Sequence, residues 1–200
     1  MPTENPHEYV MYTDGGCYNA GKRKGDGSYA FLFKTDNREF VDVCCEFISN
    51  TTNNRTEMMA VIEGLKHANV RNMSDIEIIS DSSYLVNGYT DPAYLEKWIN
   101  NGWKTSTNKP VQNVDLWTEL QKMSWHMGFN FKHIRGHNKD RNKTHAFWNS
   151  ICDKACTYML TNFTNPGFIV TLRYYFKSKT FEQINARLVE RQDDNYGCDN

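Results

Sequence analysis

Long hydrophobic runs are missing from this 200-residue sequence. No segment reaches the roughly 18 consecutive apolar residues that a membrane-spanning helix needs, and residues 1–8 lack the basic and apolar regions of a secretory leader. An excess of charge of one sign is missing too, because 23 Lys and Arg residues are balanced by 24 Asp and Glu residues. We therefore expect a soluble, intracellular protein of the cytoplasm or nucleus, whose contacts with any polyanion depend on local patches.

Compact pairs of cysteines are also missing. The six cysteines are scattered through a chain of full domain size, and the sequence has no CxxC knuckle of the kind found in zinc sites. We expect buried thiols in a reducing compartment and no structural disulfide. An alternative combines Cys152 and Cys156 with His145 or His137 in a zinc site. The simpler interpretation places both cysteines on the inward face of a helix.

The order of the secondary-structure signals predicts an α/β fold. A hydrophobic content of 39% suffices for one main core plus a tail. Strand-like runs cover 8–13, 28–34, 39–47, 76–80 and 129–134, and helical periodicity covers about fifteen residues from Asn54, two segments around 98–110, and residues 114–125 and 146–160. Because a helix separates the first and fourth strands, we expect these two to be parallel. The expected architecture is a five-stranded mixed sheet flanked by helices.

Four carboxylates are predicted to meet at one edge of this sheet. Asp14 and Asp81 follow the first and fourth strands, and open α/β sheets place their sites at the carboxyl ends of parallel strands. Glu57 opens the long helix, and Asp153 adjoins the apolar stripe of the last helix. Crowded carboxylates repel one another, and divalent cations relieve that repulsion. Hard oxygen ligands select Mg²⁺ or Mn²⁺, and two such ions about 4 Å apart can drive phosphodiester cleavage.

Each of these acids alone is more simply explained as a turn or capping residue, but the strings around them are more specific. They are YTDGGC (12–17), TTNNRTEMMA (51–60), SDSSY (80–84) and NSICDKA (149–155). In this order, from about residue 10 to 160, they resemble the motifs of type 1 ribonuclease H, a bacterial and eukaryotic family of the retroviral integrase-like superfamily. The resemblance implies a ribonuclease H-like fold and an endonuclease that cuts the RNA strand of RNA·DNA hybrids to 5′-phosphate and 3′-hydroxyl ends. It further implies two Mg²⁺ ions, for which Mn²⁺ can substitute, on Asp14, Glu57, Asp81 and Asp153.

Two further segments resemble elements of the same family. WINNGWKTSTNKPVQNVDLW (98–117) resembles the basic protrusion, or handle, of the cellular enzymes, although residues 99–101 replace its usual run of lysine and arginine. FKHIRGHNKD (131–140) resembles the strand and loop that carry the family's histidine, which by similarity is His137 and which assists proton transfer or product release. The interval from His137 to Asp153 is longer than usual, so His145 remains an alternative.

Contacts to the hybrid are expected near the long helix and in the handle. The 2′-OH of RNA is recognised as donor and acceptor by amide side chains, a task that suits Asn53 and Asn54. The resemblance places Thr52, Asn54 and Arg55 beside the substrate, with Asn19 as a further candidate. Simple capping of the helix by residues 52–54 is equally compatible with the sequence. Trp98 and Trp103 do not share one helical face, so we expect one to pack and the other to contact the DNA strand.

The chain is expected to divide after the last predicted helix. Residues 1–160 form the catalytic domain, and residues 161–200, strand-like over 168–176 and helix-like over 180–191, form a C-terminal extension of unknown role. We expect a monomer that binds the hybrid and no membrane. Two alternatives remain: a catalytically silent hybrid-binding module, which has no need of four repelling acids, and another nuclease of the superfamily, against which TNNRTE and the handle argue.

Overall fold

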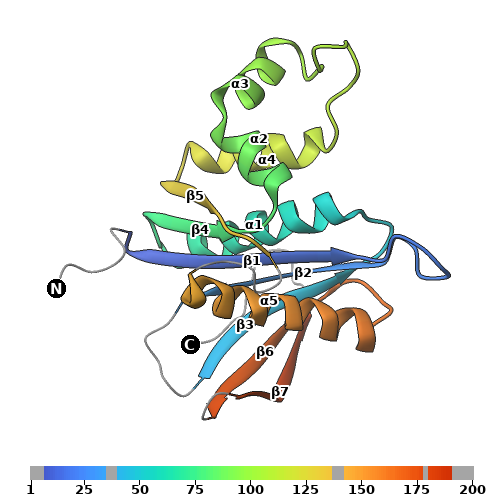
Figure 1. Ribbon diagram of the computed structural model, residues 1–200, viewed down its shortest axis with the longest axis vertical. Coiled ribbons are helices and arrows are strands. Elements are labelled where there is room, and N and C mark those ends of the chain that lie inside the picture. The colour runs from blue at the N-terminus through green and yellow to red at the C-terminus, as the bar shows by residue number, and fades with distance from the viewer. Residues whose placement is uncertain (1–6, 35–39, 137–141, 178–179, 191–200) are drawn as a thin grey trace.

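Seven strands form one mixed sheet in the computed structural model, which describes residues 7–34, 40–136, 142–177 and 180–190 (Figure 1). The strands are β1 Tyr9–Cys17, β2 Gly27–Phe33, β3 Phe40–Ile48, β4 Ile76–Ser80, β5 Phe129–His133, β6 Phe168–Lys177 and β7 Thr180–Glu190. Their order across the sheet is β5-β4-β1-β2-β3-β6-β7. β1, β4 and β5 are parallel, and the other neighbours are antiparallel. The predicted parallel pairing of the first and fourth strands is therefore confirmed.

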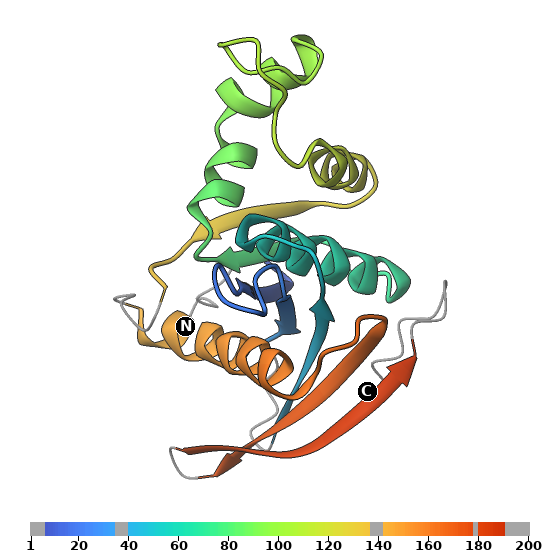
Figure 2. The ribbon, with the colours of Figure 1, turned by 90° about the vertical axis from the view of Figure 1, so that its right-hand side faces the viewer.

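Helices cover both faces of this sheet. They are α1 Asn53–Val70, α2 Ser83–Thr90, α3 Pro92–Asn100, α4 Val114–Ser124 and α5 Lys143–Asn162. α1 lies on one face and α5 on the other, while α3 and the loop after it project away from the body (Figure 2). The described ranges contain no helix that is both long and apolar enough to cross a membrane. The predicted α/β class is confirmed.

Alternation along β1 places its side chains in two of the three hydrophobic core clusters. Successive strand side chains point to opposite faces, so Tyr12 joins Ile151 and the other inward residues of α5, whereas Met11 joins Leu65 and the other inward residues of α1. The second cluster continues into the handle through Trp117, which is fully buried. Both helices are thereby fixed against β1, whose carboxyl end carries Asp14.

The segment after residue 160 adds two strands to the five that were predicted. β6 pairs with β3 in antiparallel fashion, and Val170 and Leu172 are fully buried in the α5-side cluster. Arg173 donates two hydrogen bonds of 2.7 Å to Asp42 and so joins the same two strands through side chains. The larger strand count follows from this pairing, because β3 would otherwise be an exposed edge.

The prediction of a helix over 180–191 is wrong, because this segment forms β7. The β6–β7 ladder has an irregularity: Tyr174 pairs with Gln183 and Arg173 pairs with Asn185, which leaves one extra residue in β7. An inserted residue breaks the period of two along a strand. The apolar residues of the segment are consequently spaced by three and four, as they are in a helix.

The cysteines correct one expectation and support another. Cys44 is disulfide-bonded, so the expectation of no structural disulfide is wrong: spacing along the chain does not report which thiols the fold brings together. The other described cysteines, Cys17, Cys45, Cys152 and Cys156, are free. The two thiols of α5, Cys152 and Cys156, face inward, where they donate to the backbone oxygens of Tyr12 and Asp14, both at 3.5 Å. This arrangement agrees with the simpler interpretation of that pair.

Candidate active site

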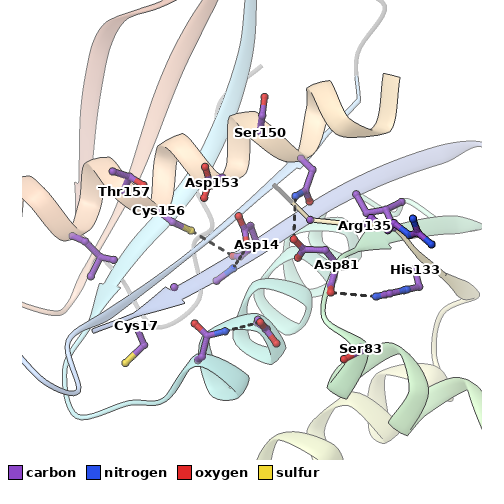
Figure 3. Close-up of a pocket in the computed structure, with 18 of the residues that line it drawn as sticks. Asp14, Cys17, Asp81, Ser83, His133, Arg135, Ser150, Asp153, Cys156 and Thr157 are labelled. Carbon is purple, nitrogen blue, oxygen red and sulfur yellow. Dashed lines mark hydrogen bonds between the residues drawn. The ribbon is translucent and has the colours of Figure 1, made fainter. Parts of the chain in front are cut away.

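Four carboxylates from four elements line one pocket. Asp14 lies in β1, Glu57 in the first turns of α1, Asp81 directly after β4 and Asp153 in α5. Because β1 and β4 are parallel neighbours, their carboxyl ends lie at the same edge of the sheet. Figure 3 shows Asp14, Asp81 and Asp153 gathered between α5 and this edge. The structure thus brings together all four acids that the sequence predicted to meet.

The carboxyl of Asp14 is strongly perturbed by its surroundings. Burial raises the pKa of its carboxyl well above the usual range, and the charges of Asp81 and Asp153 raise it further. The Gly15 backbone N–H opposes this shift by donating a 2.8 Å hydrogen bond to Asp14 Oδ1. Burial and these neighbouring charges therefore disfavour the ionised form of Asp14.

Glu57 is fixed by two donors and by a close backbone approach. Asn53 Nδ2 donates to Glu57 Oε1 at 2.7 Å, and Ser82 Oγ donates to Glu57 Oε2. Burial raises the pKa of the Glu57 carboxyl, and the hydrogen bond from Ser82 opposes that rise. A Cβ on Gly15 would lie 2.4 Å from Glu57 N. Only glycine at position 15 lets β1 come so close to α1, which sets Glu57 beside Asp14.

Asp81 is held by its neighbours on two sides. Asn149 Nδ2 donates to Asp81 Oδ2 at 3.5 Å, and His133 Nε2 lies 3.2 Å from the backbone oxygen of Asp81, which can only accept. A Cβ on Gly136 would lie 2.1 Å from Asp81 Oδ2. The backbone at residue 136 therefore packs directly on this carboxylate, and a larger residue would displace it.

The donor set of the pocket fits hard divalent cations. Its four acids offer carboxylate oxygens, and Asn149 Oδ1, buried in the pocket wall, has no hydrogen-bond partner among the described residues. Oxygen donors of this kind suit Mg²⁺ and Mn²⁺. Within the described ranges no three His, Cys, Asp or Glu side chains are already drawn together as a ligand shell. A cation bound here would draw the carboxylates of these different elements closer together.

The comparison with known families covers most of the chain. A model of the RNase H family matches residues 6–160. The chain belongs to the ribonuclease H family. The ribonuclease H of Thermoanaerobacter sp. (strain X514) is 36% identical over 159 residues, which are 78% of this chain and 92% of that protein. The prediction of a ribonuclease H enzyme is thereby confirmed.

Solved structures of ribonuclease H domains share the fold. The PFV RNase H domain superposes with a TM-score of 0.63 at 22% identity, covering 76% of this chain and 93% of the domain. A foamy viral protease-reverse transcriptase in complex with RNA/DNA hybrid gives a TM-score of 0.63 at 18% identity, covering 79% of this chain and 21% of that one. The predicted ribonuclease H-like fold is confirmed. The family match ends at residue 160, before β6 and β7.

The candidate histidines of this family member differ in their surroundings. His137 lies outside the described residues. His145, in the first turn of α5, has its Nδ1 2.9 Å from the hydroxyl of the buried Tyr12 and does not line the carboxylate pocket. His133 does line the pocket and was not among the residues predicted from the sequence. Its position at the end of β5 could have indicated this, because His133 pairs with Ser80, the residue before Asp81.

The predicted hybrid-contact residues outside the handle differ in exposure and in whether they line the pocket. Asn53 is exposed and lines the pocket, while Thr52 is exposed beside it. Arg55 donates to both carboxylate oxygens of Asp115, at 3.0 and 2.6 Å, and so ties α1 to α4. Asn54 is half-buried, and Asn19 is exposed and outside the pocket lining.

The two predicted tryptophans of the handle both pack. The Trp98 ring lies between Tyr94 and Trp117, with ring centroids 5.6 Å away in each case. Trp103 adopts a left-handed backbone conformation, with φ of 60°, and packs partly buried against the same cluster. The contact of one of them with DNA stays a prediction.

Proposed function

We propose that this chain hydrolyses the RNA strand of RNA·DNA hybrids, leaving 5′-phosphate and 3′-hydroxyl ends, with two divalent cations held by Asp14, Glu57, Asp81 and Asp153. One observation carries the proposal: these four acids, from four elements, line one pocket in a chain of the ribonuclease H family. All four come from a single chain, which supports action as a monomer.

The chain's own residues prepare the pocket for this chemistry. Asn53 and Ser82 fix both oxygens of Glu57, and Asn149 and the backbone at Gly136 confine the carboxylate of Asp81. Bound Mg²⁺, or Mn²⁺ in its place, supplies compensating positive charge at the cleaved phosphodiester. Because these contacts restrain Glu57 and Asp81 before the substrate arrives, less reorganisation of these two side chains is left for the reaction itself.

His137 is proposed to assist proton transfer or product release. The hydrogen bond between His145 and Tyr12 supports this choice, because it holds the His145 imidazole outside the pocket lining. His137→Ala should lower kcat by about 10² to 10⁴ and leave the Mg²⁺ dependence unchanged, whereas His145→Ala should stay within a few-fold of the original. A larger kcat loss at His145 would transfer the role to that residue.

Recognition of the hybrid is proposed to use the start of α1 and the handle. Thr52 and Asn53 are exposed beside the pocket, where hydroxyl and amide groups can meet a 2′-OH or a backbone oxygen. Asn54 and Arg55 follow on the same helix, Asn19 stands on the loop after β1, and Trp98 and Trp103 belong to the handle. Arg55 also positions α1 against α4 through its two hydrogen bonds to Asp115.

A substrate panel tests the proposal. The chain is incubated with labelled RNA·DNA, RNA·RNA, DNA·DNA and single-stranded RNA, each with Mg²⁺ and with EDTA, and Asp14→Asn is run in parallel to expose contaminating nucleases. We expect Mg²⁺-dependent cutting of the hybrid alone, with 5′-phosphate ends on the RNA. Equal cutting of RNA·RNA would favour another nuclease of the superfamily. Hybrid binding without any cutting would favour the silent binding module.

A further inference from the structure

The carboxylate pocket continues past the four acids along α5. There it is lined by Cys17 and Tyr18 at the end of β1 and by Thr157 and Leu160 of α5. Tyr18 lies four residues beyond Asp14, which corresponds to about 13 Å along an extended strand. Its side chain is 39% exposed. An exposed aromatic residue outside the core therefore lies at this end of the pocket.

The Tyr18 ring is held in place although it is exposed. The guanidinium of Arg23 lies 5.1 Å from the ring centroid. That guanidinium is itself fixed, because it donates to the Phe163 backbone oxygen at 3.0 Å and pairs with Asp26 at 2.8 Å. The backbone of Tyr18 is fixed as well: its N–H donates to the Asp26 backbone oxygen at 2.8 Å, and its backbone oxygen accepts from the Gly25 N–H at 2.9 Å. An aromatic group that is already ordered loses little conformational entropy when it binds a ligand.

We infer that Tyr18 is a specificity-determining residue, whose ring packs on a ribose of the RNA strand near the cleaved linkage and whose hydroxyl hydrogen-bonds the 2′-OH of that ribose. The inference rests on the proposed function. A side chain that lines the pocket beyond the carboxylates meets the same strand that is cut there. The phenol can both donate and accept, as the 2′-OH can. Among the described residues, the Tyr18 hydroxyl makes no hydrogen bond.

A cycle that pairs protein variants with altered substrates tests this contact. The proteins are the original chain, Tyr18→Phe, which keeps the ring and removes the hydroxyl, and Tyr18→Ala. Trp125→Ala serves as the matched control, because Trp125 is an exposed aromatic residue at the end of α4 and does not line the pocket. The substrates are hybrids with one dominant cleavage site, in which single nucleotides on either side of that site carry 2′-deoxyribose.

Tyr18→Ala should raise KM for the all-ribose hybrid about 5- to 100-fold, the range expected when an aromatic contact to a nucleotide is lost, with kcat within about twofold. Tyr18→Phe should raise KM only several-fold. With the original chain, one flanking 2′-deoxy substitution should raise KM by a similar factor, and Tyr18→Phe should be insensitive to that same substitution. Trp125→Ala should behave like the original chain.

The outcomes separate the inference from the proposed function. If the original chain does not cut the hybrid, the proposed function fails. If it cuts the hybrid and both Tyr18 variants keep the original KM, the inference on Tyr18 is overturned. It is also overturned if Tyr18→Phe remains as sensitive as the original chain to every 2′-deoxy substitution, because the hydroxyl then reads no ribose. Thermal unfolding of Tyr18→Phe confirms that a change in KM does not reflect misfolding.

Discussion

At the scale of single residues, Asp14 combines burial with the charges of the neighbouring carboxylates. Asp14→Asn removes one proposed cation ligand and one repelling charge together. We expect turnover to fall below a few percent of the original, because loss of a ligand removes nearly all catalysis. In EDTA the variant should be as stable as the original chain or more stable, since the repulsion is relieved. Hybrid cleavage and urea unfolding midpoints measure the two effects.

Glu96→Gln is the matched control for this substitution. Glu96 is exposed on α3 and does not line the pocket. Its loss of charge should change neither turnover nor the unfolding midpoint by more than experimental error. Substantial activity in Asp14→Asn, or its failure to fold, would remove Asp14 from the proposed ligand set.

His67 gives the chain an acid-sensitive point far from the pocket. Burial, and to a smaller extent the positive charge of Arg71, lower the pKa of its imidazole to about 4. Arg71 Nη1 also donates a 3.2 Å hydrogen bond to His67 Nδ1. The folded state therefore favours the neutral ring. The stability that this preference contributes is complete above the unfolded pKa, near 6.5, and is lost as the pH falls toward 4.

His67→Phe should remove this acid sensitivity, because the ring packs against Phe31 and Phe33 and a phenyl group suits that space. Between about pH 6.5 and pH 4 the original chain should lose about 3 kcal/mol more unfolding free energy than His67→Phe. Urea titrations over this range measure the difference. The exposed His126, changed to Gln, provides the control. Parallel pH profiles of the original chain and His67→Phe would contradict the expectation.

At the scale of elements, the start of α1 is held by side-chain contacts within its first turns and not by a hydrogen bond from the N-cap side chain. Thr52 occupies the N-cap position but makes no side-chain capping hydrogen bond. Asn53 instead donates to Glu57, and Thr56 Oγ1 donates to the Asn53 backbone oxygen. The simple capping explanation for residues 52–54 therefore lacks its main contact, and the side chains of Thr52 and Asn53 are left exposed for other partners.

Gly15→Ala tests how strictly β1 and α1 must approach. The new Cβ would meet the backbone of Thr56 and Glu57 at about 2.5 Å, so the start of α1 must move and carry Glu57 away from Asp14. We expect a stability loss of about 1 to 3 kcal/mol and a fall in kcat of about 10²-fold or more, because small misplacements of catalytic groups are costly. Gly128→Ala, where a Cβ meets nothing within 4 Å, should be neutral. Unchanged kcat in Gly15→Ala would show that α1 adjusts without cost.

At the scale of the whole molecule, we propose that residues 1–160 carry the catalytic machinery and that residues 161–200 stabilise it from the edge of the sheet. Within the part of the chain that the structure describes, every residue that lines the carboxylate pocket precedes position 161. Val170 and Leu172 of β6, in contrast, belong to the same core cluster as the inward residues of α5. We therefore expect the extension to contribute to the stability of the core and not to the carboxylate pocket.

Truncation after Phe163 tests this division. It removes the burial of Val170 and Leu172, worth about 3 kcal/mol or more, and it exposes β3 as an edge strand. We expect a clearly lower unfolding midpoint with hybrid cleavage retained at temperatures where the shorter chain is folded. Truncation after Glu190, which keeps both strands, is the control. If the shorter chain were as stable as the original, the extension would be an appendage outside the core.

Much of the fold and of the site was predictable from local patterns. Alternation and turn residues located β1 to β5 within a few residues, and apolar spacing located α1, α4 and α5. The order of strands and helices required β1 and β4 to be parallel, which places Asp14 and Asp81 at one edge. These features depend on neighbours in the sequence and on general rules of connection, so the sequence by itself determined them.

Tertiary packing decided the rest, because the decisive contacts join residues that are far apart in the chain. The bulge in β7 hid a strand behind helical spacing, and only its pairing with β6 resolved it. The contact of Gly136 with Asp81 and the tie between Tyr12 and His145 each span more than fifty residues of sequence. No local pattern reports such pairs. The sequence therefore determined which acids meet, and the packing of α5, β5 and the β1–β2 loop around them decided which other side chains surround the pocket.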